Sequence, residues 1–134
     1  MKTLLILMLA FLANGQTSGC DKGVSLNQEV TLKYGQTIEV KEEKLKIKFV
    51  SVEEDSRCPQ GAQCIRAGNG IITLSVTTAD NKSTSVTLST TGESQEFIYQ
   101  GLGIRLVDLQ PRPKSGVTFN HNDYVVTLKI YKQT

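Results

Sequence analysis

Two cysteines, Cys58 and Cys64, are the residues of this chain whose type and spacing indicate chemistry most directly. They lie six positions apart in the segment EEDSRCPQGAQCIRAGNG (residues 53–70), which also contains Arg57 and Arg66, two of the four arginines. A cysteine pair of this kind forms a disulfide, binds a metal ion or acts as a redox centre. The choice depends on the spacing, on the other ligands in the chain and on the compartment in which the protein works.

The spacing favours a disulfide. Structural zinc takes four nitrogen or sulfur ligands, usually with about two to four residues between paired cysteines; here five residues separate the pair, and the chain has one histidine, His121. Redox cysteines prefer the C-x-x-C spacing at a helix N-terminus. Pro59 and Gly61 supply the backbone angles that a compact reversal requires. We therefore predict a Cys58–Cys64 bridge worth roughly 2–3 kcal/mol, with no metal and no cofactor.

The N-terminal residues predict export. Lys2 precedes an unbroken apolar run of nine residues, LLILMLAFL (residues 4–12). That run has the length of a signal-peptide core and is too short to span a bilayer. Residues 1–19 are therefore predicted to be a signal peptide, and export places the mature chain where disulfides form.

Two cleavage sites compete. The segment TSGC (residues 17–20) resembles the lipobox of bacterial lipoproteins, in which the peptidase cuts before the cysteine and lipid is attached to it, although Thr17 stands where leucine is usual. Small residues at Ala13 and Gly15 instead permit cleavage after Gly15, which would release a soluble secreted or periplasmic protein. Pairing the other two cysteines leaves Cys20 over, and lipidation resolves the odd count. We favour a lipid anchor at Cys20.

Two further clusters have simpler interpretations. His121-Asn122-Asp123 contains the usual general base of enzymes, but no nucleophile motif such as G-x-S-x-G accompanies it, so we predict a turn there and no enzymatic activity. Glu53-Glu54-Asp55 offers the oxygen ligands that calcium prefers without the alternating spacing of a calcium loop. We predict that these acids form a solvated entrance to the cysteine loop.

The elements that position the cysteines read as strands. In KLKIKF (residues 44–49) Leu45, Ile47 and Phe49 alternate with lysines, which marks a strand with one buried face. Apolar residues then continue on the opposite parity, which predicts a bulge near residues 50–51. Further strands are predicted over residues 29–33, 36–40, 71–78, 83–88, 95–99, 104–109 and 124–131.

Seven or eight short strands separated by polar turns predict an all-β fold, either an antiparallel sandwich or a small barrel. Residues 29–134 form the single domain, and residues 20–28 are predicted to be a tether. The formal net charge is +2, falling to about +1 without Lys2, so there is no basic excess for nucleic acid. The chain has no tryptophan and few aromatic residues for stacking on sugars.

The segment EDSRCPQGAQCIRAGNG, followed by an alternating strand, resembles a motif of small exported bacterial proteins, many of them predicted lipoproteins, that carry D-S-R-C-P-x-x-x-x-C and then A-G. The segments LKYGQT and IRLVDLQPRPKS are also similar to that group, so the resemblance spans most of residues 29–132. The resemblance implies export, a β-domain and a disulfide. It implies no activity.

The sequence therefore predicts an exported, membrane-anchored protein of the cell envelope that acts as a binding or structural module. Its partner is an unidentified protein or envelope component, and it touches the membrane only through its lipid. The predicted partner-facing residues of the loop are Arg57, Pro59, Gln60, Gln63 and Arg66. The alternative is a small envelope hydrolase or a protease-inhibitor-like domain, and a deep pocket that gathers His121 and Asp123 would favour an enzyme.

Overall fold

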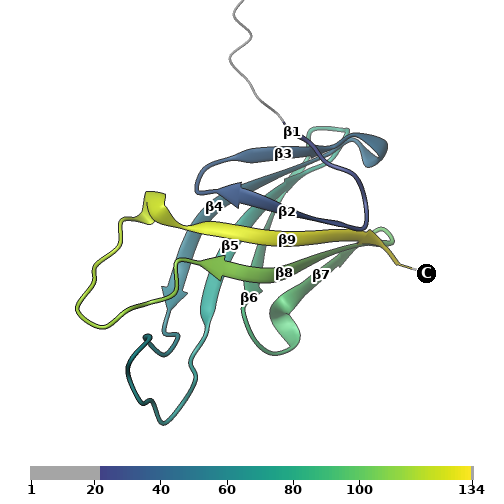
Figure 1. The fold of residues 1–134 in the computed structure, drawn as a ribbon. Coiled ribbons are helices and arrows are strands. Elements are labelled where there is room, and N and C mark those ends of the chain that lie inside the picture. Colours follow the sequence, from purple (N-terminus) through teal and green to yellow (C-terminus); the bar gives the residue numbers. More distant parts are fainter. Residues whose placement is uncertain (1–21, 134) are drawn as a thin grey trace, which may run out of the picture.

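The protein is a β-sandwich. The computed structural model describes residues 22–133, in which eight strands form two four-stranded antiparallel sheets and a two-residue strand adds to one edge (Figure 1). The first sheet has the order β1 (Lys22–Gly23), β3 (Thr37–Val40), β4 (Leu45–Asp55), β5 (Gly70–Thr77) and β6 (Ser83–Ser89). The second has the order β2 (Gln28–Lys33), β9 (Val125–Lys132), β8 (Leu102–Gln110) and β7 (Glu96–Tyr99). The sheets do not close into a barrel, so the sandwich alternative is confirmed.

The strands form where apolar residues alternate. Leu45, Ile47 and Phe49 of β4 are buried while the lysines between them are exposed. The register of β4 against β5 shifts between Phe49 and Ser51, as the change of parity predicts, and β8 shifts in the same way after Leu106. A bulge adds a residue to one strand and lets the buried face continue on the other parity.

The core lies between the sheets and is made of aliphatic side chains with few aromatic ones. Both sheets contribute, because each strand turns every second residue inward. The largest side chains that are fully buried are Leu32, Ile38, Ile47, Phe49, Ile72, Leu74, Leu88, Ile104, Leu106, Leu109, Leu128 and Ile130.

Residues 22–28, expected to be the end of a tether, instead lie against the domain. Lys22 and Gly23 pair in parallel with Ile38 and Glu39 of β3, and residues 24 and 26 pack against the core as partly buried apolar side chains. Hydrophobic burial explains the difference, because Val24 and Leu26 have apolar surface that a free tether would leave in water. The signal peptide, both cleavage sites and Cys20 lie outside the described residues.

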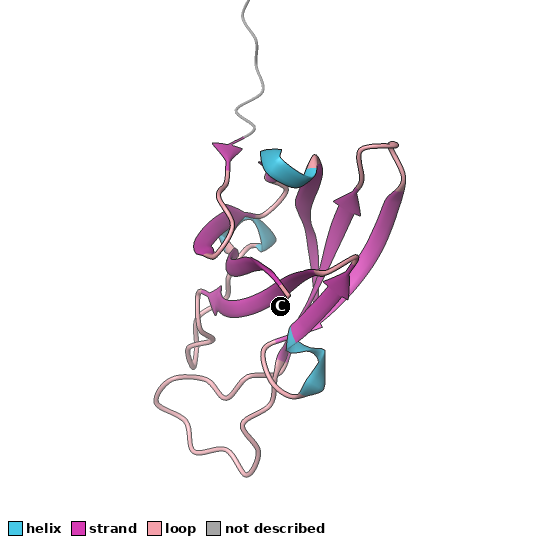
Figure 2. Cartoon of the chain, turned by 90° about the vertical axis from the view of Figure 1, so that its right-hand side faces the viewer, coloured by secondary structure: helices cyan, strands magenta, loops and turns pink. Residues whose placement is uncertain are grey.

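Three connections gather at one end of the sandwich. They are the cysteine loop between β4 and β5 (residues 56–69), the β6–β7 turn with its 3₁₀ helix η2 (Glu93–Gln95), and the proline loop between β8 and β9 (residues 111–120). A 3₁₀ helix, η3 (His121–Asp123), follows the proline loop; another, η1 (Lys41–Glu43), joins β3 to β4. Figures 1 and 2 show the cysteine loop projecting from the bottom of the molecule, whereas the described chain begins at β1 at the top.

Candidate functional site

The cysteine loop is narrower than its length indicates, because its two arms continue the β4–β5 hairpin. The backbone N–H of Ser56 donates to the carbonyl oxygen of Asn69 at 2.8 Å, and the N–H of Cys58 donates to the carbonyl oxygen of Ala67 at 2.8 Å. The irregular part is therefore the loop tip, which we define as residues 59–66. The connection over residues 56–69 is long for a compact domain, and these two bonds reduce it to a short tip on a paired stem.

Gly68 permits this close approach of the arms. Its φ of +65° is a left-handed conformation, and a Cβ atom there would lie 1.8 Å from the carbonyl oxygen of Ser56. No side chain fits at that distance, and the positive φ disfavours other residues as well. The glycine of the A-G pair in the motif therefore has a local geometric reason.

The loop tip is closed by the predicted disulfide between Cys58 and Cys64, whose Cα atoms lie 5.9 Å apart. Inside the ring, the N–H of Ala62 donates to the carbonyl oxygen of Pro59 at 3.1 Å, and Gly61 takes a φ of +84°. The predicted turn residues thus form the turn. The bridge is confirmed, and both arms of the tip are tied at its base.

The tip also rests on the proline loop. The N–H of Gln60 donates to the carbonyl oxygen of Pro113 at 2.8 Å, and Gln60 forms an isolated parallel bridge with Lys114. Residues more than fifty positions apart in the chain are therefore side by side, and the two loops form one surface.

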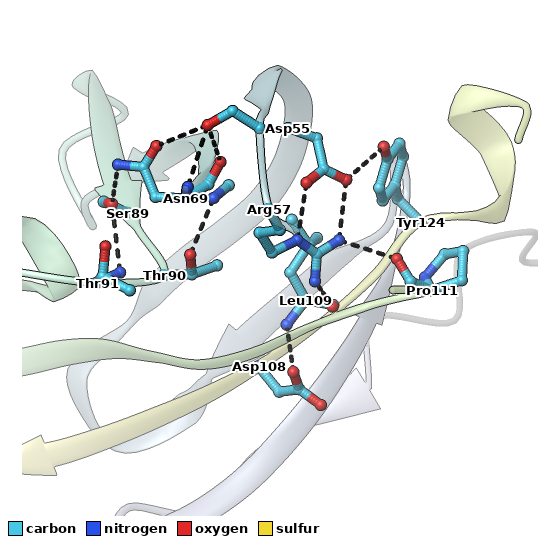
Figure 3. A network of polar contacts seen from close by, with 12 residues as sticks. Asp55, Arg57, Asn69, Ser89, Thr90, Thr91, Asp108, Leu109, Pro111 and Tyr124 are labelled. Atoms are coloured by element: carbon cyan, nitrogen blue, oxygen red, sulfur yellow. Dashed lines mark hydrogen bonds and ion pairs between the residues drawn. The ribbon is translucent and has the colours of Figure 1, made fainter. Parts of the chain in front are cut away.

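Beneath the tip, Arg57 joins three segments of the chain (Figure 3). Its Nε and Nη2 atoms donate to the two carboxylate oxygens of Asp55 at 2.8 and 2.9 Å. Its Nη1 and Nη2 atoms also donate to the carbonyl oxygens of Leu109 and Pro111, the latter at 2.9 Å. The Tyr124 hydroxyl donates to Asp55 Oδ2 at 2.9 Å. A planar guanidinium with a fixed fork of donors suits such a multiple contact.

The electrostatics of this cluster keep it in one protonation state. Burial opposes ionisation of Asp55, but the hydrogen bonds from Arg57 and Tyr124 and the positive charge of Arg57 outweigh it, so the pKa of Asp55 lies below its ordinary value. The pKa of Tyr124 is raised by burial and by its bond to the Asp55 carboxylate. At neutral pH the acid is ionised and the phenol is a donor. All these groups are used in internal bonds, so the cluster acts as a brace between loops.

The prediction that Arg57 faces a partner is wrong. Its side chain is 13% exposed and that of Asp55 is 10% exposed, because the guanidinium is drawn inward by acceptors on β4 and on the proline loop. Asp55 likewise does not belong to a solvated entrance. Its neighbours Glu53 and Glu54 are exposed, and hydrogen bonds from Ser51 and Thr73 lower the pKa of Glu53.

The other predicted contact residues lie on the tip itself. Gln60, Gln63 and Arg66 are exposed, and Pro59 is half-buried. Ile65 was not among the predicted contacts, yet its exposed fraction of 104% makes it the most exposed large apolar residue described. Its position directly after Cys64 was the available signal, since it belongs to neither neighbouring strand pattern.

A second polar cluster ties the stem of the loop to the β6–β7 turn. Asn69 Nδ2 donates to Ser89 Oγ at 3.0 Å, and the Gly70 N–H donates to Thr90 Oγ1 at 2.9 Å (Figure 3). A cleft of about 350 Å³ lies beside these residues. Of the polar groups in its lining, Thr90 Oγ1 is used in that bond, and Asp108 accepts from the N–H of Leu109 and the side chain of Gln110. The bond to Thr90 holds the β6–β7 turn against the stem of the loop, whereas both bonds to Asp108 lie within β8.

The segment His121-Asn122-Asp123 takes the structure that was predicted for it. His121 and Asp123 are exposed in η3, where the Asn120 N–H donates to Asp123 Oδ2 at 3.0 Å in a capping box; the predicted turn is confirmed. The ring of His121 lies 6.0 Å from that of Tyr34. Within residues 22–133 no group of three or more histidine, cysteine or acidic residues is placed to hold a metal ion.

No family model, no curated protein and no solved structure matches this chain. In the part of the chain that the structure describes, no helix is long and apolar enough to cross a membrane.

Proposed function

We propose that the protein is an exported, lipid-anchored binding module of the cell envelope that contacts its partner through the tip of the cysteine loop. One observation carries this proposal: a fully exposed apolar side chain, Ile65, is held at the end of a stem that is braced by a disulfide and by Arg57. We choose Ile65 as the contact because it is the most exposed large apolar residue among those described and lies on a loop whose stem is fixed. The brace lowers the entropy lost on binding, because the tip is already ordered.

The position of β1 supports an orientation in which the loop tip points away from the membrane. Cys20, the proposed lipid site, precedes Lys22 by two residues, and β1 lies at the top of Figures 1 and 2 while the loop tip lies at the bottom. Two residues span at most about 7 Å. A lipid on Cys20 would therefore hold the β1 edge near the membrane and direct the tip away from it.

The resemblance to exported bacterial proteins with the D-S-R-C-P motif fits the same proposal. The motif residues build the brace and the ring, with Arg57 and Cys58 at the base and Pro59 at the start of the tip. The resemblance therefore concerns residues that brace and close the loop.

Site-specific crosslinking in whole cells tests the binding surface. A photoreactive amino acid replaces Gln63 or, as the matched control, Lys82, which is also exposed but lies in the β5–β6 turn away from the loop. We expect the Gln63 probe to give a defined crosslinked product, which Ile65→Ser reduces, and the Lys82 probe to give none. Products of equal yield at both positions would refute a specific contact at the tip.

Metabolic labelling with an alkynyl palmitate analogue tests the anchor. We expect the wild-type protein to carry the label and Cys20→Ser to lack it. An unlabelled wild-type protein of the mass produced by cleavage after Gly15 would exclude the lipid and leave the loop proposal to the crosslinking result.

A further inference from the structure

The two loops that meet at the tip contain basic residues and no acidic ones. The cysteine loop (residues 56–69) has Arg57 and Arg66, and the proline loop (residues 111–120) has Arg112 and Lys114. No aspartate or glutamate occurs in either segment, although the whole chain is close to neutral. The surface formed by the two loops is therefore locally basic.

Three of these four cations have no counter-ion among residues 22–133. Arg57 is paired with Asp55, but within residues 22–133 Arg66, Arg112 and Lys114 form no ion pair, and all three are exposed. The acids that flank the loops are engaged elsewhere. Asp108 accepts from the N–H of Leu109, and Asp123 caps η3.

The same surface exposes aliphatic side chains. Ile65 is 104% exposed on the cysteine loop, and Val117 is 47% exposed on the proline loop. Gln60 bridges the two loops through Pro113, so the cations and the apolar groups belong to one support. A protein-binding surface combines apolar groups at its centre with a polar rim, and the two loops together supply both kinds of side chain.

We infer that the partner is a protein whose contact surface carries carboxylates around an apolar socket that receives Ile65. This inference rests on the proposed function and adds the chemistry of the partner. Carboxylates complement the three free cations, which steer association and select against basic partners. An anionic polysaccharide would satisfy the cations but would offer no apolar counterpart to Ile65. An anionic membrane is disfavoured because the proposed anchor lies at the other end of the sandwich.

Synthetic polypeptides of defined composition test the inference by standing in for the partner. The mature protein is studied as exported, in a phosphatidylcholine nanodisc if it is lipidated and in solution if it is not. Binding of fluorescent poly-glutamate and of a random glutamate–tyrosine copolymer is measured by anisotropy at low and moderate salt. We expect the copolymer to bind more tightly, because it offers apolar groups beside carboxylates, and both affinities to fall with added salt.

Variants separate the two contributions. Ile65→Ser is expected to weaken copolymer binding about tenfold and to leave poly-glutamate binding unchanged. The triple variant Arg66→Gln, Arg112→Gln, Lys114→Gln is expected to weaken both probes by roughly thirtyfold, about threefold for each exposed cation. The matched control removes three exposed lysines near the other end, Lys41→Gln, Lys46→Gln, Lys48→Gln, and is expected to retain binding.

Three outcomes would overturn the inference. Equal losses in the loop triple variant and the control triple variant would show that the probes bind any basic surface. If Ile65→Ser binds the copolymer as tightly as the wild type, the partner needs no apolar socket for Ile65. The third outcome is that the wild-type protein floats with vesicles of three parts phosphatidylcholine to one part phosphatidylglycerol, that Ile65→Ser does not, and that the copolymer does not bind. That result would show that the surface contacts a membrane. If crosslinking at Gln63 persists in these cases, the proposed function stands and only the partner class is wrong.

Discussion

The two arginines on either side of the disulfide have opposite environments. Arg57 lies one residue before the ring and is 13% exposed, with bonds to Asp55, to the carbonyl oxygen of Leu109 in β8 and to that of Pro111 in the proline loop. Arg66 lies two residues after the ring and is exposed without an ion pair to any residue among 22–133. The same side chain thus serves as internal support at the base of the loop and as an available cation at its tip. The base stabilises the loop, and the tip is left exposed to solvent.

Replacing each arginine by alanine is the strongest test of this division. Arg57→Ala leaves Asp55 charged and mostly buried without its partner, which typically costs about 3 kcal/mol or more. Arg66→Ala removes an exposed side chain that forms no ion pair with the residues the structure describes, and it is expected to change the free energy of unfolding by less than about 0.5 kcal/mol. Urea denaturation measures both. Similar values for the two variants would contradict the difference between base and tip.

Removing the disulfide tests whether the ring stabilises the whole fold or only orders the tip of the loop. Cys58→Ser with Cys64→Ser is expected to cost about 2 kcal/mol, because the bridge closes a short ring and restricts the unfolded chain only modestly. The far-UV circular dichroism of the sandwich should be unchanged, since the bridge lies outside the core. Crosslinking from Gln63 should become less specific. Complete unfolding of the double variant would show that the ring supports the whole fold.

Replacing two glycines of the loop by alanine compares the loss of stability in the stem with that in the tip. Gly68→Ala is expected to cost about 2 kcal/mol or more, from its left-handed φ and from the collision with Ser56. Gly61→Ala has a φ of +84° but no atom within 4 Å of the new Cβ, so we expect about 1 kcal/mol of conformational strain alone. Thermal or urea unfolding measures the difference. A larger loss at Gly61 would mean that the tip is more tightly packed than its stem.

The pH dependence of stability distinguishes the buried acid from an exposed one. The lowered pKa of Asp55 adds stability above its unfolded pKa of about 3.9, and this contribution is lost as the pH falls through that value toward the lower folded pKa. The difference between wild type and Asp55→Asn should therefore shrink in acid. The exposed Asp80, whose pKa is also lowered by a bond from Thr78, is the control, and Asp80→Asn should give a much smaller change.

Replacing Tyr124 is expected to have the smallest effect on stability. Its pH dependence lies in the alkaline range, whereas that of Asp55 lies in the acid range. Tyr124→Phe removes one hydrogen bond to Asp55 and is expected to cost about 1 kcal/mol at neutral pH. Its raised pKa means that its contribution is complete below about pH 10 and is lost as the pH rises through the folded value. If wild type and Tyr124→Phe were equally stable at neutral pH, the Tyr124 hydroxyl would not contribute to the brace.

Much of the fold was predictable from short-range patterns. Alternation in KLKIKF predicted β4, the change of parity at Val50 predicted the bulge, and the cysteine count predicted the Cys58–Cys64 bridge. Each depends on residues that are close in the sequence, where sterics and side-chain period act directly. The placement of Arg57 was not predictable in this way, because its acceptors Leu109 and Pro111 are 52 and 54 residues away.

The sequence by itself determined that the chain is an all-β protein with a turn closed by two cysteines, because those features follow from alternation, turn residues and cysteine spacing. Tertiary structure alone decided that the two sheets stack as a sandwich, that residues 22–28 pack on it, and which arginine is buried. It also decided that Ile65 remains in water beside Arg66. The physical reason is that burial and charge pairing depend on partners from distant strands, which the order of residues along one segment does not specify.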